Sequence, residues 1–222
     1  MSDDLRWSAG ERALFSRGGR FDAWAFAWVK DETPADAVAI APAEGLRRLA
    51  ATGGIRRVPI GVIGPKEATA AERATAEALG RALAVHGLQL LCGGKSGVME
   101  AACKGCLEAG GLPVGLLPDE DWRQANPYVA IPIATGIGPA RNALIARAAQ
   151  ALVAVGGGYG TLSEMAFGLH FGRPVLTLGE APPVEGAKAC ADVDDAIGRI
   201  ARHLLGRAPW RPVIKSSSDQ DM

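Results

Sequence analysis

Apolar residues from about position 59 onward fall into short, nearly continuous runs that rarely alternate with polar residues. Such runs are typical of strands buried on both faces of a parallel sheet. The predicted strands are Pro59–Ile63, Leu88–Leu91, Pro113–Leu117, Val129–Ile133, Ala151–Val155 and Pro174–Leu178. The predicted helices, all rich in Ala and Leu, are Ala70–His86, Val98–Ala109, Pro139–Ala149, Thr161–Phe171 and Asp192–Leu205. This alternation predicts an α/β fold with a doubly wound, mostly parallel sheet and helices on both faces.

The first 57 residues have a different pattern. Trp24, Phe26 and Trp28 occupy alternate positions, which predicts a strand with one aromatic face. A short helix is expected at Ala43–Ala51, followed by the linker Thr52-Gly53-Gly54. We interpret this part as an extension that packs on the main domain or on a partner subunit. The predicted division is an N-terminal extension (1–57), a nucleotide- or phosphate-binding domain (58–206) and a polar C-terminal tail (207–222).

Composition and charge narrow the function classes. The 24 basic and 24 acidic residues leave no net charge, which argues against a nucleic-acid surface, and no charge block suggests a membrane tail. The polar segment Met1–Glu11 is unlike a secretory signal, and no apolar run approaches the ~20 residues that span a bilayer. We therefore expect a soluble, cytoplasmic protein without a nucleic-acid or membrane partner.

Cysteine and histidine positions give little support to a metal site. Cys103 and Cys106 have C-x-x-C spacing, which is compatible with a redox site, a zinc site or simple packing. Packing is favoured, because the pair lies inside a small-residue helix with no second pair and no nearby His. The remaining cysteines are Cys92 and Cys190, and the histidines are His86, His170 and His203. We expect neither a bound metal nor a resident cofactor.

Two glycine-rich turns, each between a predicted strand and a predicted helix, indicate a phosphate site. They are Gly93–Gly97 and Gly156–Gly160. Glycines allow tight turns and close approach of a ligand, and a helix N-terminus offers unpaired N–H groups that suit an anion. The residues expected to contact the ligand are Gly64, Gly93, Gly94, Lys95, Ser96, Gly97, Arg141, Asn142, Gly157, Gly158, Tyr159, Gly160 and Thr161. Neither a P-loop nor a G-x-G-x-x-G fingerprint is present.

Two charged residues near these turns have alternative interpretations. Arg141, in the first turn of a helix, could form a surface ion pair, but its position beside the glycine turns favours contact with a bound anion. Glu164 and Thr161 have the spacing of a capping box, which needs no ligand. The same carboxylate could instead bind a ligand hydroxyl or act in acid–base chemistry, and the sequence leaves both open.

Three motifs together resemble the lonely guy (LOG) superfamily. They are Gly93–Glu100, the pair Arg141-Asn142, and Gly157–Glu164, and the resemblance extends from about Arg57 to Leu205. It implies a modified Rossmann fold and a homodimer. It also implies the chemistry of the best-known members, which cleave the N-glycosidic bond of cytokinin riboside 5′-monophosphates. Their catalytic Arg and Glu match Arg141 and Glu164.

Two departures from the LOG pattern point to a sister branch. Asn142 stands where those enzymes have Lys, and Gly156 stands where they have Pro. Both departures resemble the molybdenum cofactor carrier proteins, which bind a phosphorylated pterin. The resemblance thus implies a binding or carrier protein for a phosphorylated, nucleotide-like ligand. The alternative is a nucleoside 5′-monophosphate phosphoribohydrolase that uses Arg141 and Glu164 as catalytic residues.

Overall fold

The large sheet has the parallel architecture expected from the sequence. The computed structural model describes residues 4–206, so the predicted tail at 207–222 lies outside the described residues. Within that range seven strands form one sheet, and all its neighbouring strands pair in parallel. Their order is β12 (Lys188–Ala189), β11 (Val175–Leu178), β10 (Ala151–Val155), β6 (Pro59–Ile63), β7 (Gln89–Cys92), β8 (Val114–Leu117) and β9 (Ile131–Ala134).

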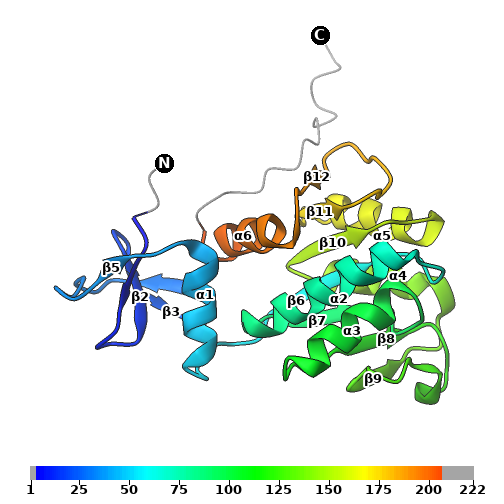
Figure 1. The fold of residues 1–222 in the computed structure, drawn as a ribbon, viewed down its shortest axis with the longest axis horizontal. Coiled ribbons are helices and arrows are strands. Elements are labelled where there is room, and N and C mark those ends of the chain that lie inside the picture. The colour runs from blue at the N-terminus through cyan, green and yellow to red at the C-terminus, as the bar shows by residue number, and fades with distance from the viewer. Residues whose placement is uncertain (1–3, 207–222) are drawn as a thin grey trace, which may run out of the picture.

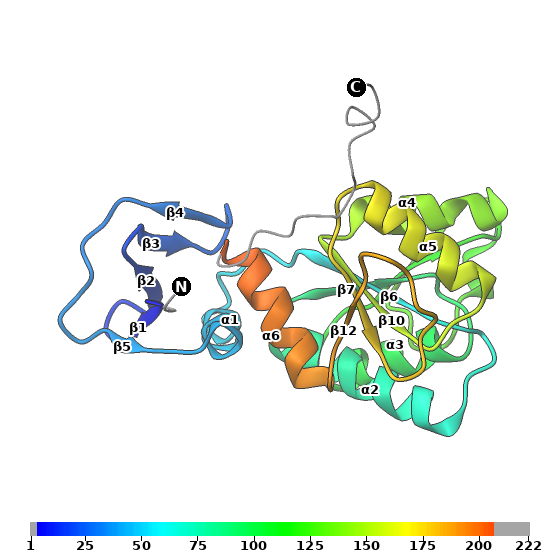
Figure 2. The same ribbon diagram turned by 90° about the horizontal axis from the view of Figure 1, so that it is seen from above.

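Helices cover both faces of this sheet, which confirms the α/β, Rossmann-like fold (Figure 2). One face carries α2 (Ala70–Val85), α3 (Val98–Glu108) and α6 (Val193–Leu204), and the other carries α4 (Arg141–Ala148) and α5 (Tyr159–His170). Successive residues of β10 divide between the two cores: Val153 faces the first set of helices, and Leu152 and Ala154 face the second. Burial on both sides explains why the strands read as continuous apolar runs.

The N-terminal residues form a second, antiparallel sheet (Figure 1). Over residues 6–39 its order is β4 (Ala27–Val29), β3 (Gly19–Asp22), β2 (Ala13–Ser16), β1 (Arg6–Ser8) and β5 (Val38–Ala39), and the helix α1 (Pro42–Ala51) follows. One sequence prediction here is wrong, because the segment from Trp24 to Trp28 is not one strand. Residues 23–26 form a turn.

Hydrogen bonds within a turn explain why the alternating aromatic residues do not form one strand. The Asp22 carboxylate accepts the N–H groups of Trp24 and Ala25, at 2.8 and 2.9 Å. Phe26 has φ 53°, a left-handed conformation that a strand excludes. Trp24 is consequently 61% exposed, whereas Trp28 packs against Phe21 with ring centroids 5.1 Å apart.

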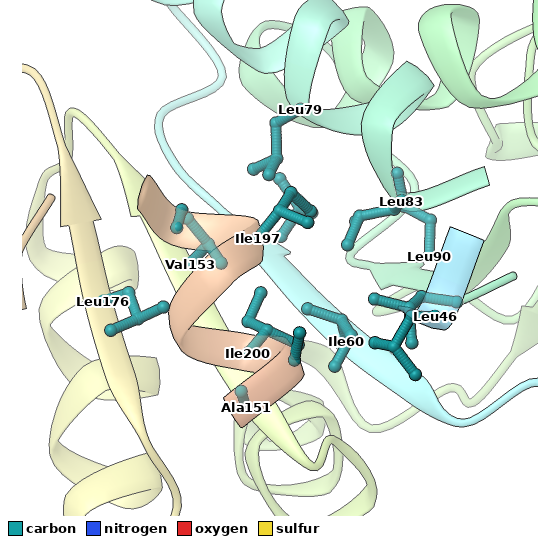
Figure 3. Close-up of a cluster of buried hydrophobic side chains, with 14 of the residues drawn as sticks. Leu46, Ile60, Leu79, Leu83, Leu90, Ala151, Val153, Leu176, Ile197 and Ile200 are labelled. Carbon is teal, nitrogen blue, oxygen red and sulfur yellow. The ribbon is translucent and has the colours of Figure 1, made fainter. Parts of the chain in front are cut away.

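The two sheets meet through α1 and α6, which pack against each other (Figure 2). Figure 3 shows the shared core, in which Leu46 of α1 lies near Ile60, Leu83 and Leu90 of the large sheet and its helices. The Trp28 indole N–H also donates to the carbonyl of Leu205 at 3.1 Å, just beyond α6. The N-terminal segment therefore shares the apolar core of the main domain. Among the described helices, none has the length and apolarity to cross a membrane.

Replacing Leu46 with Ala should destabilise the whole protein. Leu46 is fully buried, and truncation of such a leucine costs about 2–5 kcal/mol of unfolding free energy. Urea unfolding followed by circular dichroism should show one transition at lower urea. The control is Val85→Ala, at a side chain that is 45% exposed, which should change the unfolding free energy by less than about 1 kcal/mol. A separate early transition involving the N-terminal sheet alone would contradict the shared core.

Candidate functional site

The strand order of the large sheet reverses between β6 and β10. From β6 the chain adds β7, β8 and β9 in one direction, whereas β10, β11 and β12 extend in the other. Ligands of such sheets bind beyond the carboxyl ends of the strands at this reversal. Gly64 and Gly156 are the residues that follow β6 and β10 there. A Cβ atom on Gly64 would lie 2.6 Å from the Val155 carbonyl oxygen, so Gly64 has a packing reason, and its ligand contact stays a prediction.

The loop Gly93–Gly97 is held down by its neighbours. Gly97 has φ 74° and lies against the carbonyls of Pro65 and Lys66, where a side chain would collide. The N–H of Gly94 donates to the Cys92 sulfur at 3.3 Å, so that amide is already engaged inside the protein. The loop is therefore fixed at Gly94 to the end of β7 and at Gly97 to the segment that follows β6.

The side chain of Lys95 also has partners within the protein. Its ammonium donates to the Asp119 carboxylate at 2.9 Å and to the Gln124 carbonyl at 3.0 Å. The segment after β8 therefore contacts this loop through several hydrogen bonds. The side-chain amide of Asn126 also donates to the Lys95 carbonyl at 3.0 Å. Lys95 would have to exchange a partner to reach a bound anion.

The second glycine loop leaves the start of α5 open. The helix begins at Tyr159 with Gly158 as its N-cap, and no side chain of the described residues caps it. The capping-box interpretation of Glu164 is therefore wrong, because the helix starts two residues earlier than the sequence suggested. Apart from chain neighbours and the backbone of the helix itself, no heavy atom of residues 4–206 lies within 4 Å of a Cβ built on Gly158 or Gly160. The first-turn N–H groups of a helix have no intrahelical acceptor, so those of α5 are available near this open surface.

Arg141 links Gly93 of the first loop to Glu164 of α5, the helix that follows the second loop. Its side chain is only 8% exposed, and Nη1 donates to Glu164 Oε1 at 2.9 Å and to the Asn142 side-chain oxygen. The guanidinium lies against Gly93, where any side chain would collide with it. Asn142 in turn donates to Ser163 Oγ at 2.8 Å. The predicted residues Arg141, Asn142 and Glu164 are therefore brought into one buried cluster between α4 and α5.

The carboxyl group of Glu164 has a pKa close to neutral pH. Burial raises the pKa of its carboxyl from the ordinary 4.5 to about 7, although the charge and hydrogen bond of Arg141 act in the opposite direction. Desolvation therefore outweighs the attraction of the guanidinium. A carboxyl group with a pKa in this range can both accept and donate a proton at physiological pH.

The guanidinium retains capacity for a further bond. Its Nε atom is buried and has no hydrogen-bond partner among the described residues. Because this Nε is shielded from solvent, an oxyanion would reach it only after a neighbouring group moved. The cluster can therefore supply a fixed positive charge and a titratable carboxyl beside Gly93 and close to the open start of α5.

Sequence reasoning missed one acidic residue beside the site. The Glu72 carboxylate occupies the space that a Cβ of Gly156 would need. It is held there by a capping box at the start of α2, in which Thr69 N–H donates to Glu72 Oε2 at 2.7 Å. The spacing Thr69-x-x-Glu72 is a recognisable signal for that cap. Its approach to Gly156, however, depends on tertiary packing.

Gly156 has φ 61°, which proline cannot adopt, so the backbone here differs from that of a Pro-containing motif.

Comparisons with known proteins agree with this architecture. The model of the SLOG cluster4 family matches residues 57–200. A cytokinin riboside 5′-monophosphate phosphoribohydrolase of Rhodococcoides fascians is 30% identical, and the match covers 56% of this chain and 79% of that protein.

Two solved structures are similar over most of the same range. A molybdenum cofactor binding protein of Rippkaea orientalis is 33% identical with a TM-score of 0.64, covering 67% of this chain and 98% of that one. The molybdenum cofactor carrier protein of Chlamydomonas reinhardtii is 40% identical with a TM-score of 0.62, covering 68% and 99%.

Glu164 should impose a measurable pH dependence on stability. Because its pKa is higher in the folded protein, the folded state holds a proton that the unfolded chain has released above about 4.5. The stabilising contribution is therefore present below that pH and is lost as the pH rises through about 7. The slope is at most about 1.4 kcal/mol per pH unit.

Unfolding free energies of the parent and Glu164→Gln should be compared between about pH 5 and pH 8. The parent should lose stability relative to the variant as the pH rises, because glutamine does not titrate. Parallel curves for the two proteins would show that the carboxyl is ionised throughout.

Proposed function

The chain belongs to the SLOG cluster4 family, and on that premise we propose that it binds a phosphorylated, nucleotide-like small molecule as a carrier. The phosphate would lie between Gly93–Gly97 and Gly157–Thr161, beyond the carboxyl ends of β6, β7 and β10. A binding role also fits the similarity to a molybdenum cofactor binding protein and a molybdenum cofactor carrier protein.

The observation that carries this proposal is one buried guanidinium that lies against Gly93 of the first glycine loop and bonds Glu164 of α5, the helix that follows the second loop. The open side of Gly158 and Gly160 would let phosphate oxygens approach the first-turn amides of α5. Arg141, fixed against Gly93, would supply the positive charge at close range. Such an arrangement suits an anion, because each element is in place before the ligand arrives and little ordering cost remains.

The ligand class follows from the same contacts. Amide groups and one guanidinium recognise the phosphate but leave the attached ring system unspecified. A nucleoside 5′-monophosphate and a phosphorylated pterin both present a single phosphate beside a planar ring. We propose these two classes as the ligands to test first.

The alternative function is hydrolysis of a nucleoside 5′-monophosphate at its N-glycosidic bond. The buried Arg141–Glu164 pair supports it, since a carboxylate stabilises an oxocarbenium-like transition state. The similarity to a phosphoribohydrolase of Rhodococcoides fascians points the same way. The neutral Asn142 favours the carrier proposal, because the LOG enzymes that this chain resembles have a lysine there. Incubation with a panel of nucleoside monophosphates separates the two: released base means hydrolysis, and binding without release means a carrier.

We also propose a homodimer in solution. Several large apolar side chains remain exposed on β9 and α4, including Ile131, Ile133 and Leu144, and a partner subunit could cover them. Analytical ultracentrifugation at micromolar concentration should give the mass of two chains. A monomer under these conditions would contradict the proposal.

Replacing Gly158 with Val should abolish ligand binding without unfolding the protein. Gly158 has φ −138° and ψ −160°, an extended conformation that any residue adopts. Its Cβ would enter open space, so the fold should tolerate the side chain while the ligand loses its close approach. Calorimetric titration with adenosine 5′-monophosphate should show at least about a tenfold loss of affinity, the equivalent of about 1.4 kcal/mol.

Gly198→Ala provides the matched control. Gly198 lies in α6, where an added methyl group meets only the Arg202 side chain at 3.8 Å. The control should bind as the parent does. Unchanged affinity in a well-folded Gly158→Val protein would contradict the proposal that the ligand phosphate binds at the start of α5.

A further inference from the structure

A pair of buried thiols lies directly beneath the Gly93–Gly97 loop. Cys92 is the last residue of β7, Cys103 is in α3, and their sulfur atoms are 3.5 Å apart. Both side chains are fully buried. A disulfide has a sulfur–sulfur distance of about 2.05 Å, so a movement of roughly 1.5 Å would bring the two atoms to bonding distance.

We propose that Cys92 and Cys103 form a reversible disulfide when the protein is exposed to a peroxide, and that this bond weakens ligand binding at the adjacent loop. The first half stands on the geometry of the thiols alone. The second half rests on the proposed function, because it assumes that the Gly93–Gly97 loop holds the ligand.

The surroundings of the two sulfurs assign them different roles. The contact with Cys103, together with the Gly94 N–H and the charge of Arg141, holds the pKa of the Cys92 thiol below its ordinary value despite burial. The contact with Cys92 and burial raise the pKa of the Cys103 thiol. The thiolate is the reactive form, and the Gly94 N–H that reaches the Cys92 sulfur at 3.3 Å favours it there, so Cys92 is assigned as the attacking group and Cys103 as the resolving group.

The chemistry balances with one peroxide molecule. The Cys92 sulfur attacks a peroxide oxygen and the O–O bond breaks, which leaves a sulfenic acid and, after proton uptake, one water. The Cys103 sulfur loses its proton and attacks the Cys92 sulfur, the S–O bond breaks, and a second water leaves. Two thiols and one hydrogen peroxide thus give one disulfide and two waters. The sulfurs lose the two electrons that the peroxide gains.

The new bond would act on the ligand loop through Gly94. The N–H of Gly94 donates to the Cys92 sulfur at 3.3 Å, and this bond helps to hold the left-handed Gly94, whose φ is 68°. Moving the sulfur toward Cys103 draws it away from that amide. The disulfide would also close a ring over residues 92–103 that contains the whole loop. Gly93, on which the Arg141 guanidinium rests, lies inside this ring.

The chain supplies its own controls. Cys106 lies one turn beyond Cys103 on α3, and Cys190 follows β12 in another part of the fold, and both are free thiols. Only the contact between Cys92 and Cys103 joins two sulfurs among the described residues. A bond specific to this pair is therefore distinguishable from general oxidation.

The test begins with the full-length, folded chain treated with hydrogen peroxide, after which free thiols are blocked with an alkylating reagent. Intact mass before blocking should show the loss of two hydrogens, and the blocked protein should carry two fewer alkyl groups than the blocked reduced control. A non-reducing peptide map should join the peptides of Cys92 and Cys103. Cys103→Ala should lack this product, and Cys190→Ala should retain it. No linked peptide in the parent, or a link from Cys103 to Cys106, would overturn the assignment. The map of the parent decides the question even if Cys103→Ala does not fold.

The second measurement compares the affinity of the reduced and oxidised parent for adenosine 5′-monophosphate and for inorganic phosphate. Oxidation should weaken binding by at least about tenfold, because the displaced loop would no longer present the proposed phosphate contacts. Dithiothreitol should restore it. Equal affinities of the reduced and oxidised protein would contradict the claim that the disulfide weakens ligand binding. If the reduced protein binds neither probe, both this claim and the proposed function fail. The peptide map still shows whether the disulfide forms.

Discussion

The burial of one guanidinium is the constraint on which the rest of the candidate site depends. Removing Arg141 from water costs several kcal/mol, and the cost is offset only if its donors find acceptors at good distance. Glu164, from α5, and Asn142, from α4, supply those acceptors. Gly93 supplies the space, because its missing side chain is where the guanidinium lies. A glycine in one loop and a carboxylate in another are therefore tied to the same cation.

The same pair explains why Glu164 titrates near neutral pH although an arginine touches it. Desolvation favours the neutral carboxyl, and the single short contact with Arg141 Nη1 does not fully compensate. A ligand phosphate that arrives at Arg141 would compete with Glu164 for the guanidinium. Such competition favours protonation of Glu164 on binding, since two anions would otherwise share one cation. Binding of the proposed ligand would then be coupled to proton uptake at Glu164.

Much of the large domain was predictable because its physical signals are local. Continuous apolar runs identified six strands of the large sheet to within about two residues at their starts, from Pro59 to Val175. The short edge strand β12 has only two residues, Lys188 and Ala189, and carries no apolar run. The alternation of Trp24, Phe26 and Trp28 wrongly predicted a strand, because hydrogen bonds from the backbone to the Asp22 side chain stabilise a turn there instead. The partners of Lys95 and the position of Glu72 depend on contacts between distant segments, which spacing alone does not encode.

Asn142 links these local and distant effects. A lysine at this position, as in the LOG pattern, has no acceptor and could not take a hydrogen bond from Arg141 Nη1. The asparagine oxygen accepts that bond, while its nitrogen donates to Ser163 in the first turns of α5. The substitution therefore exchanges a second cation for a neutral bridge that fixes Arg141 to the helix carrying Glu164. With one cation fewer, the site has less charge with which to stabilise a departing anionic group. In exchange, the neutral bridge holds Arg141 in place before a ligand arrives, which lowers the ordering cost of the binding proposed here.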